Sequence, residues 1–230
     1  MRHTLYVVGT PIGNLEDVTP RALQVLRQVA LIASENPSRT RRLLARYDID
    51  TPMQRFTDAY DRKKASRLST VLAALEHGDV ALVSEAGMPL LADPGYELVQ
   101  AVLDRGIDVV AVPGPTALTA ALSVSGLPAV PFVFLGFVPR QSAARRTLFR
   151  TYARDARTLV LYESPGRLEG TLHDALAELG PRRVAIANEL TKLYEEVWRG
   201  DLRGAAAQFV EKPRGEYVVV IDGGEEAQDE

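Results

Sequence analysis

Short apolar runs alternate with amphipathic segments along most of the 230-residue chain. Apolar runs of five to seven residues bounded by Gly, Pro or Asp predict strands. In the first half, the predicted strands cover Thr4–Val8, 30–34, 53–57, 79–84 and 107–112. Strands separated by helical patterns in this way indicate an α/β fold with helices layered on a sheet.

Helix starts are marked by a capping residue followed by proline, at Thr19–Pro20 and again at Asp93–Pro94. The side chain of such a residue caps the helix, and proline fits the first helical position. The predicted helices of the first half cover 20–29, an arginine-rich segment ending near 47, 61–76, and 94–105.

The second half carries the same kinds of pattern with more strands next to one another. Its predicted elements are a helix at 116–125, a strand at 132–138, a second arginine-rich helix, a strand at Thr158–Glu163, a helix at 167–179, strands at 184–189 and 194–200, a short helix, and a strand at 217–222. Adjacent strands predict a mixed sheet. We therefore expect two α/β domains, 1–113 and 114–222, followed by an acidic flexible tail at 223–230.

The composition is that of a globular protein, with 46% apolar and 25% charged residues. No window approaches the roughly 18 apolar residues that a membrane span requires, and the N-terminus runs directly into a strand. We expect a cytoplasmic protein without a membrane segment. The chain has no cysteine, and its three histidines, His3, His77 and His173, are widely separated. This composition excludes disulfides and thiolate chemistry, and we expect no metal site.

Charge is unevenly distributed. The net charge is −3, but 222–230 holds five acids and no base, which leaves the rest of the chain at +2. Arginine gathers in two runs, 39–46 and 140–157. Each run fits a solvated helix face, and together they favour a phosphate-rich partner.

Three loops rich in small residues follow predicted strands, at 9–13 (GTPIG), 84–95 (SEAGMPLLADPG) and 113–117 (PGPTA). Ligands of open α/β sheets bind at such positions. None of the loops matches G-x-G-x-x-G or a Walker phosphate loop. The first loop fits a structural tight turn, and Asp93 in the second fits a helix cap. The third leads into a helix N-terminus, which can hold an anion. The loops indicate a small-molecule cleft without identifying the molecule.

An ordered set of motifs runs from about residue 5 to 221: GTPIGNLED, TRRLL, EAGMPLLADPGY, VPGPTALTAAL, FLGFVPR, YESPGRL, ELTKLYEEVWRG and GEYVVVI. In this set the chain resembles the tetrapyrrole-methylase superfamily. The resemblance is strongest to the branch that methylates a cytidine 2′-hydroxyl of bacterial 16S ribosomal RNA. It implies two α/β domains with an S-adenosylmethionine (AdoMet) site in the cleft between them. It also implies a homodimer and a substrate within the small ribosomal subunit.

The resemblance implies site residues at matching positions. The cofactor contacts that it implies are Pro11, Ala86, Gly87, Met88, Thr116, Ala117, Glu163 and Leu190. Gly136 and Phe137 match an interdomain strand. Glu163 and Leu190 match positions that flank the cofactor from the C-terminal half, and Glu216 lies near them. The family usually has Glu-Asp-Thr-Arg where this chain has Glu35-Asn36-Pro37-Ser38-Arg39, and Asp and Thr at positions 85 and 88. It also commonly has Pro-His-Arg where this chain has Pro-Gly-Arg at 165–167. Met88 lacks the threonine hydroxyl, so a side-chain contact to the cofactor at this position is in question.

Methyl transfer to a ribose hydroxyl needs alignment and a group that helps the proton leave. Lys192 and Glu189, at a predicted strand end, are the leading catalytic candidates, with Glu35 behind them. An ion pair holding the strand end explains Lys192 and Glu189 equally well. The RNA-binding candidates are Arg39, Arg41, Arg42, Arg140, Arg145 and Arg146, because arginine pairs bidentately with phosphate. Four tyrosines are candidate stacking platforms or core residues: Tyr60, Tyr96, Tyr162 and Tyr194.

Two alternatives stay open. The chain fits a methylase of a tetrapyrrole such as a corrin precursor, although the first arginine-rich helix and the YESPGRL and ELTKLYEE motifs favour RNA. It also fits an RNA-binding relative whose activity has been eroded by Asn36, Glu85 and Met88.

Overall fold

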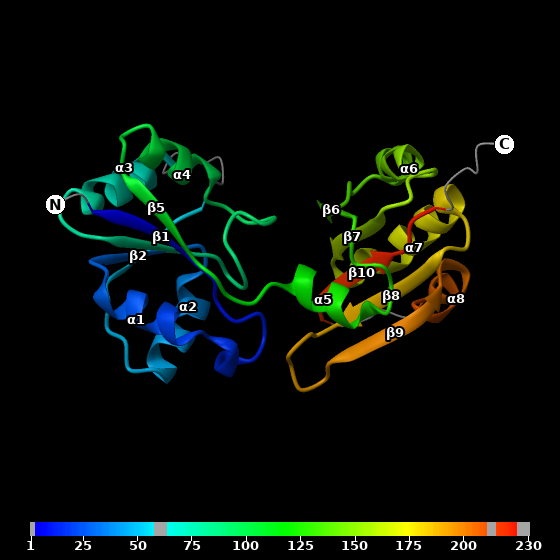
Figure 1. Cartoon of the computed structure of the whole chain (residues 1–230), viewed down its shortest axis with the longest axis horizontal. Coiled ribbons are helices and arrows are strands. Elements are labelled where there is room, and N and C mark those ends of the chain that lie inside the picture. Colours follow the sequence, from blue (N-terminus) through cyan, green and yellow to red (C-terminus); the bar gives the residue numbers. More distant parts are fainter. Residues whose placement is uncertain (1–2, 58–63, 211–214, 225–230) are drawn as a thin grey trace. The chain divides into compact units, whose positions relative to one another are not determined.

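The structure is a computed structural model that describes residues 3–57, 64–210 and 215–224. The chain divides into two compact units, Met1–Thr116 and Ala117–Glu230, each with its own five-stranded sheet. Figure 1 labels the elements of both units. The division lies three residues beyond the predicted end of the first domain.

Unit 1 alternates strands and helices. Its elements are β1 (Thr4–Val8), a 3₁₀ turn η1 (Leu15–Asp17), α1 (Pro20–Gln28), β2 (Leu31–Ser34), α2 (Pro37–Arg46), β3 (Met53–Arg55), α3 (Lys64–Leu75), β4 (Val80–Val83), α4 (Tyr96–Leu103) and β5 (Asp108–Val112). The strands lie in the order β3-β2-β4-β1-β5, and every neighbouring pair is parallel. All five strands therefore end at the same edge of the sheet.

Helices cover both faces of the unit 1 sheet. Side chains of α1 and α2, including Leu26 and Leu43, pack on one face with Ile32 and Val83. Side chains of α3 and α4, including Val71 and Leu98, pack on the other (Figure 1). Every residue of the central strand β4 is buried. Burial on both faces explains why these strands appear in the sequence as continuous apolar runs.

Unit 2 contains a mixed sheet. Its elements are α5 (Ala117–Ser125), β6 (Phe132–Phe137), α6 (Ser142–Thr151), β7 (Thr158–Glu163), α7 (Pro165–Leu179), β8 (Arg183–Asn188), β9 (Glu196–Asp201), α8 (Leu202–Gln208) and β10 (Tyr217–Ile221). The order is β6-β7-β10-β8-β9, parallel between β6 and β7 and antiparallel elsewhere. The predicted α/β class and the mixed sheet are confirmed.

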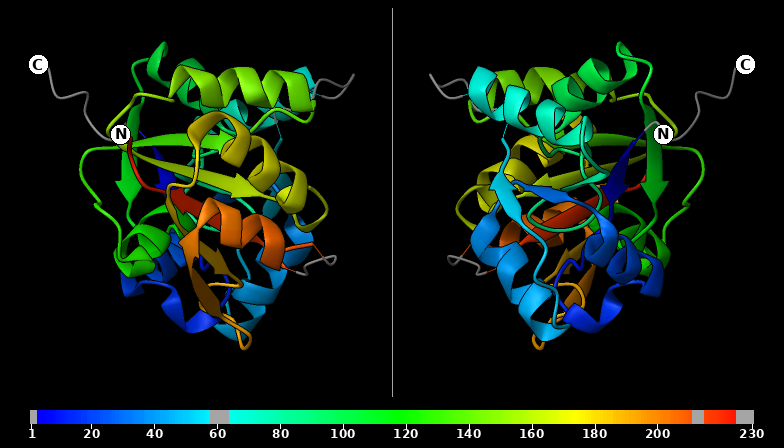
Figure 2. Two further views of the ribbon diagram at one scale, coloured as in Figure 1. Left: turned by 90° about the vertical axis from the view of Figure 1, so that its right-hand side faces the viewer. Right: turned by 90° about the vertical axis from the view of Figure 1, so that its left-hand side faces the viewer.

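The core of unit 2 lies between its sheet and three helices. Phe149 of α6, Leu168 and Leu172 of α7 and Leu202 of α8 pack against alternate residues of the strands. Figure 2 shows these helices in front of the strands in its left view. The intervening strand residues face the opposite way, because side chains of a strand alternate between faces. On that face α5 contributes the buried Leu118 and Leu122.

The capping signals gave one correct and one wrong helix start. Thr19 caps α1 as predicted, because its Oγ1 accepts a hydrogen bond from the Ala22 N–H at 3.1 Å. Asp93 does not cap α4. That helix begins at Tyr96, and Gly95, with φ +133°, occupies the cap position. The predicted helix at 61–76 lies partly outside the described residues, and α3 begins at residue 64.

Candidate functional site

Three loops meet at the carboxyl edge of the unit 1 sheet. The loop after β1 pairs with the loop after β4, through Thr10 N–H to Gly87 O at 2.9 Å and Gly87 N–H to Thr10 O at 3.0 Å. The loop after β5 lies beside the first of these, because a Cβ on Gly9 would be only 2.7 Å from Gly114 Cα. The structure therefore brings together the small-residue loops that the sequence singled out.

This edge is lined largely by backbone. Gly9 and Gly114 approach so closely that neither has room for a side chain, since a Cβ on Gly114 would lie 2.8 Å from the Gly9 carbonyl carbon. Pro11 and Gly87 are buried, whereas Ala86 and Met88 are partly exposed. Small side chains at such positions let a ligand approach the main chain closely.

The loop after β4 holds an unusual backbone. Leu90 and Ala92 have φ values of +73° and +68°, and Gly87 has φ +78°. Non-glycine residues rarely adopt this region, and such strain persists where the surrounding structure holds it. Ser84 helps to hold it, because its Oγ donates toward the carbonyls of Ala86 and Gly87 at 3.2 and 3.4 Å.

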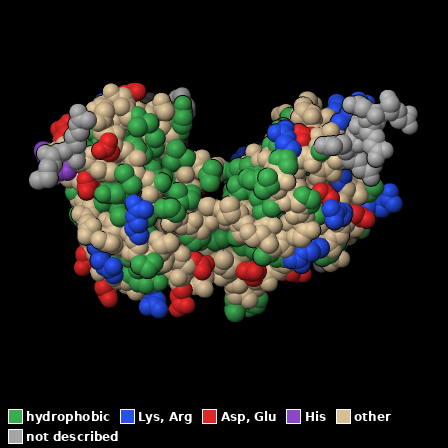
Figure 3. All heavy atoms as spheres, viewed as in Figure 1, with side chains coloured by type: hydrophobic (Ala, Val, Ile, Leu, Met, Phe, Trp, Pro, Cys, Tyr) green, Lys and Arg blue, Asp and Glu red, His purple; other side chains and the backbone are tan. Residues whose placement is uncertain are grey.

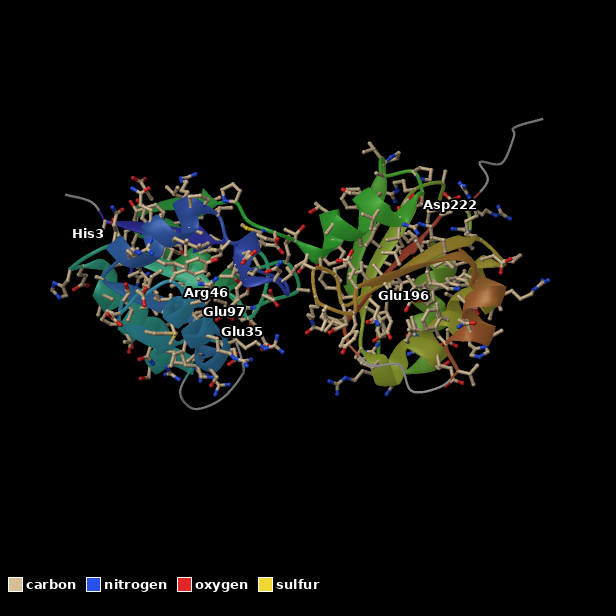
Figure 4. All side chains as sticks on the ribbon, turned by 90° about the horizontal axis from the view of Figure 1, so that it is seen from below. His3, Glu35, Arg46, Glu97, Glu196 and Asp222 are labelled. Carbon is tan, nitrogen blue, oxygen red and sulfur yellow. The ribbon has the colours of Figure 1, made fainter. Side chains whose placement is uncertain are left out.

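Three carboxyl groups gather beside this loop. Glu35 follows β2, and its Oε2 accepts a hydrogen bond from the Glu85 N–H at 2.8 Å. Figure 4 shows Glu35 at the end of unit 1 away from His3, as expected for a residue after a parallel strand. Burial first, and then the charges of Glu35 and Glu85, raise the pKa of Asp93 to about 7, and a hydrogen bond with Ser84 opposes them. Asp93, expected as a helix cap, is instead a carboxyl that titrates near neutral pH.

Two departures from the family pattern lie in direct contact. Asn36 caps α2 through Oδ1, which accepts hydrogen bonds from the N–H groups of Ser38 and Arg39. Its Nδ2 donates to Glu85 Oε2 at 3.0 Å, and Glu85 Oε1 pairs with Arg39 Nε at 2.9 Å. An amide at position 36 can both cap the helix and donate to a carboxylate at 85, so the two departures are mutually compatible.

Helix α2 presents the first arginine run. Arg39 is held by Glu85, whereas Arg41 and Arg42 are exposed and form no ion pair with any described residue. The buried face of the helix carries Leu43 and Leu44. Arg41 and Arg42 therefore lie where an external phosphate can reach them.

In unit 2 the predicted lysine lies among carboxylates. Lys192 Nζ donates to Glu189 Oε1 at 2.8 Å and to Glu216 Oε2 at 2.9 Å. The Glu216 N–H also donates to Glu189 Oε1, at 3.1 Å. Burial lowers the pKa of Lys192, but these hydrogen bonds and the two negative charges outweigh it, so the pKa is raised. Lys192 is a cation at neutral pH.

Sequence reasoning did not pair Glu216 with Lys192. The two residues are 24 positions apart. The pairing follows from the antiparallel register of β8 and β10, in which Tyr217 lies opposite Asn188. That register places Glu216 beside Glu189, and nothing in the local sequence around either residue signals it.

Glu163 and Leu190, the two predicted cofactor contacts in the body of unit 2, are buried. The Glu163 carboxylate is 2% exposed and accepts hydrogen bonds from Ser164 N–H at 2.8 Å and Thr171 Oγ1 at 2.7 Å. Arg167 Nη2 lies 3.3 Å from it. Leu190 is 8% exposed. Glu163 is thus bonded within unit 2, where it ties the end of β7 to α7. Thr116 and Ala117, which end unit 1 and begin α5, are both partly exposed.

The arginines of α6 separate into different environments. Arg145 is 6% exposed, and its guanidinium lies 2.5 Å from Asp174 Oδ2 and donates to the carbonyls of Pro139 and Arg140. It is therefore inaccessible to RNA, and the prediction that it binds RNA is wrong. Arg146 pairs with Glu178 at 2.6 Å and remains half exposed, and Arg140 is exposed. Arg145 is buried because it lies on the face of α6 that packs against α7.

The candidate stacking tyrosines also differ. The Tyr162 ring packs edge-on against Phe134 and Phe137, with ring centroids 4.9 and 5.7 Å apart. Phe137 follows Gly136, where the register between β6 and β7 shifts. Tyr96 is 65% exposed and Tyr194 78% exposed. Tyr60 lies outside the described residues.

Within the described ranges, no group of three or more His, Asp or Glu side chains is arranged to hold a metal ion. Over the same part of the chain, no helix is long and apolar enough to cross a membrane.

Comparison with protein-family models matches residues 4–206 to the Tetrapyrrole (Corrin/Porphyrin) Methylases. The chain belongs to the tetrapyrrole methylase family. The expected family and its fold are therefore confirmed.

Curated tetrapyrrole methylase relatives match nearly the whole chain. The chain is 47% identical over 223 residues to "Ribosomal RNA small subunit methyltransferase I" of Thermotoga maritima, covering 96% of this chain and 99% of the relative. It is 46% identical to the protein of the same name from Synechocystis sp., and the match covers 95% of this chain and 78% of that relative.

A solved structure shares the fold at lower identity. Uroporphyrin-III C-methyl transferase from Thermus thermophilus, complexed with S-adenyl homocysteine, gives a TM-score of 0.65 at 22% identity and covers 97% of each chain.

Proposed function

We propose that this chain transfers a methyl group from AdoMet to the 2′-hydroxyl of a cytidine in the RNA of the small ribosomal subunit. The observation that carries the proposal is the 47% identity over almost the full length to a protein named as a small-subunit ribosomal RNA methyltransferase. At this identity over 96% of the chain, the relative and this protein share the whole fold rather than one motif. The cytidine and the 2′-hydroxyl come from the resemblance of the motifs to that branch of the family.

The carboxyl edge of unit 1 fits AdoMet as a ligand. Gly9 and Gly114 bring the backbones of the loops after β1 and β5 into close contact, and Gly87 is held at φ +78° by its pairing with Thr10. An edge built from small residues lets a cofactor approach the main chain closely. We propose as cofactor contacts the residues that the resemblance implies: Pro11, Ala86, Gly87, Met88, Thr116, Ala117 and Leu190. Glu163 supports the end of β7.

AdoMet, when bound, supplies a methyl group on a positively charged sulfur. The protein must then orient the ribose hydroxyl and manage its proton, and positioning alone contributes about 7–11 kcal/mol. Because Lys192 is a cation with a raised pKa, we assign it to stabilise negative charge on the 2′-oxygen. Glu189 and Glu216 hold the ammonium group in place through hydrogen bonds of 2.8 and 2.9 Å.

The proton of the 2′-hydroxyl needs an acceptor as the new bond to oxygen forms. Glu189, bonded to Lys192, is a carboxylate within the same cluster and is our first candidate. Glu35 is the second, because its carboxylate already accepts the Glu85 N–H and lies near Asp93, the carboxyl whose pKa is about 7.

The exposed arginines supply the proposed RNA contacts. Arg41 and Arg42 of α2 and the exposed Arg140 and Arg146 are accessible, and arginine binds phosphate bidentately. Figure 3 shows basic and acidic side chains interspersed on the face in view, so RNA contact there would use a few defined arginines. We further propose that the protein acts as a homodimer in the cytoplasm, where ribosomal subunits are assembled.

A direct assay separates this function from the two alternatives. The purified protein is incubated with AdoMet and, in parallel, small-subunit RNA, assembled small subunits or a corrin precursor, and ribose methylation is mapped by mass spectrometry. The expected result is 2′-O-methylation of a single cytidine in the small-subunit RNA. The same cytidine should be unmethylated in RNA from a strain that lacks the protein. Methylation of the tetrapyrrole alone would overturn the proposal. RNA binding without AdoMet binding by calorimetry would support the eroded relative instead.

A further inference from the structure

Two apolar side chains stand exposed at the tip of the connection between β8 and β9. Leu193 is 87% exposed and Tyr194 is 78% exposed. Figure 3 shows hydrophobic side chains at the tip of this connection, which is the bend below β9 in Figure 1. Neither side chain contributes to the hydrophobic core of unit 2.

The turn that carries these side chains is fixed at both ends. The Lys192 N–H donates to Glu189 O at 2.9 Å, and the Glu195 N–H donates to Lys192 O at 3.1 Å. The Glu195 carboxylate folds back and accepts the Thr191 N–H at 2.5 Å. Through Lys192 Nζ the turn is also bonded to Glu216, beside β10. Leu193 and Tyr194 are therefore presented by an ordered turn.

The backbone of the turn is strained to make this shape. Glu189 and Thr191 have φ values of +49° and +65°. Each non-glycine residue in this region costs free energy, and such residues cluster where a site depends on a defined shape. The shape here does two things: it brings Lys192 to its carboxylates, and it directs the next two side chains into solvent.

We propose that Tyr194 is a stacking platform for an unstacked base of the RNA substrate, with Leu193 packing beside it. The inference rests on the proposed function. RNA is recognised largely through bases that are splayed out and stacked on aromatic side chains. Tyr194 follows Lys192 by two residues in the same hydrogen-bonded turn, so the proposed platform belongs to the same loop as the lysine that we assign to the ribose oxygen.

A second copy of the chain fits this tip less well than a base does. A stable protein interface buries about 800 Å² on each partner, and Leu193 and Tyr194 are only two side chains. A single base presents one flat apolar surface, which one exposed ring matches. The tip also lies next to Lys192, the cation we assign to the ribose oxygen, whereas Tyr96 lies in unit 1, on the first turn of α4.

The test compares Tyr194→Ala with Tyr194→Phe, which keeps the ring, and with Val130→Ala, an equally exposed apolar position in unit 2. Binding of small-subunit RNA, single-turnover methyl transfer, AdoMet affinity and oligomeric state are measured for each. Loss of one base stack predicts roughly 5- to 150-fold weaker RNA binding for Tyr194→Ala. The phenylalanine and Val130→Ala variants should match the parent. The slope of RNA affinity against salt and the AdoMet affinity should not change, because no charge is removed.

Each other outcome overturns the inference. If Tyr194→Ala binds and methylates RNA like the parent, Tyr194 is not a platform. If it changes oligomeric state while RNA binding per chain is kept, the tip contacts a second copy. If the parent itself neither binds nor methylates RNA, the proposed function fails as well, so the two failures are distinguishable.

Discussion

At the scale of single residues, Lys192 shows how the surroundings of a side chain limit its chemistry. Two carboxylates at 2.8 and 2.9 Å keep the ammonium charged despite partial burial. A charged lysine cannot accept a proton, but it can stabilise an alkoxide. The raised pKa therefore favours stabilisation of the alkoxide over proton acceptance as the role of Lys192.

The Lys192→Met variant removes the charge and keeps most of the apolar stem. Single-turnover methyl transfer should slow by about 10²–10⁴-fold, with little change in AdoMet or RNA affinity. Arg203→Met, an exposed cation on α8, is the control and should keep the parent rate. The pKa of Lys192 is higher in the folded protein than in the unfolded chain. Lys192 therefore stabilises the fold fully at a pH below its pKa in the unfolded chain, and this stabilisation is lost as the pH rises through its pKa in the folded protein. A parent rate in Lys192→Met would leave it a structural ion pair and move attention to Glu35.

Asn36 and Glu85 make a second prediction at this scale. Asn36→Asp keeps the helix cap but turns the 3.0 Å hydrogen bond to Glu85 into contact between two carboxylates. The free energy of unfolding should fall by about 1 kcal/mol, a modest effect because both groups are partly exposed. Adding Glu85→Gln restores a donor, so the double variant should recover the loss. Thermal unfolding of the four proteins checks this, and equal melting temperatures would rule out the compensation.

The pKa of Asp93 predicts a pH dependence of stability. Its folded pKa of about 7 lies above the ordinary value of 3.8, chiefly because of burial. Between these values the folded state keeps a proton that the unfolded chain has lost. The stabilisation is thus full below about pH 4 and disappears as the pH rises to about 7. Asp93→Asn should flatten this part of the curve of melting temperature against pH, whereas the exposed Asp50→Asn should not. Parallel curves of melting temperature against pH for the parent, Asp93→Asn and Asp50→Asn would contradict this prediction.

At the scale of elements, the loops at the carboxyl edge of unit 1 depend on glycine for two different reasons. Gly9 and Gly114 need space, since either Cβ would meet backbone within 2.8 Å. Gly87 needs its φ of +78°, because a Cβ there would meet nothing closer than 3.4 Å. A substitution at Gly87 therefore tests backbone conformation with little steric interference.

Gly87→Ala should weaken AdoMet binding, with Gly106→Ala as a matched control. Gly106 has φ +64° and nothing within 4 Å, so both variants carry the same backbone cost of about 1–2 kcal/mol. Both should lose similar stability. Only Gly87→Ala should lower AdoMet affinity, by roughly ten-fold if the loop must reorganise at that cost. Calorimetry measures the affinities, and equal affinities in the two variants would remove this loop from the cofactor site.

Local signals predicted the elements well where a single segment decides them. Thr19 and Pro20 identified the start of α1, because the cap is made within four residues. Asp93 and Pro94 carry the same signal, yet Asp93 turns toward Ser84 and the carboxylates of Glu35 and Glu85. Glu35 comes from the loop after β2, and Ser84 and Glu85 come from the far end of the same loop as Asp93, so the residues next to Asp93 could not show that these groups compete with the cap.

At the scale of the whole molecule, contacts between residues far apart in the sequence determine the surroundings of Lys192 and Arg145, which local patterns did not predict. The β8–β10 register joined Lys192 to Glu216, and packing of α6 on α7 buried Arg145 against Asp174. The motifs were sufficient for the family, because their order is a property of the chain alone. They could not say which members of an arginine run face solvent, because that depends on which face of the helix meets the core.

RNA binding by the exposed arginines should therefore come from part of each run. The double variant Arg41→Ala/Arg42→Ala removes two exposed cations of α2 that form no ion pair with a described residue. Each phosphate contact contributes close to one unit to the slope of log affinity against log salt. The double variant should therefore bind RNA more weakly and lower that slope by about two, while AdoMet affinity stays unchanged. Arg105→Ala/Arg203→Ala changes the net charge equally at exposed positions elsewhere and should keep the parent slope. Equal slopes for the two double variants would mean that general charge, and not α2, attracts the RNA.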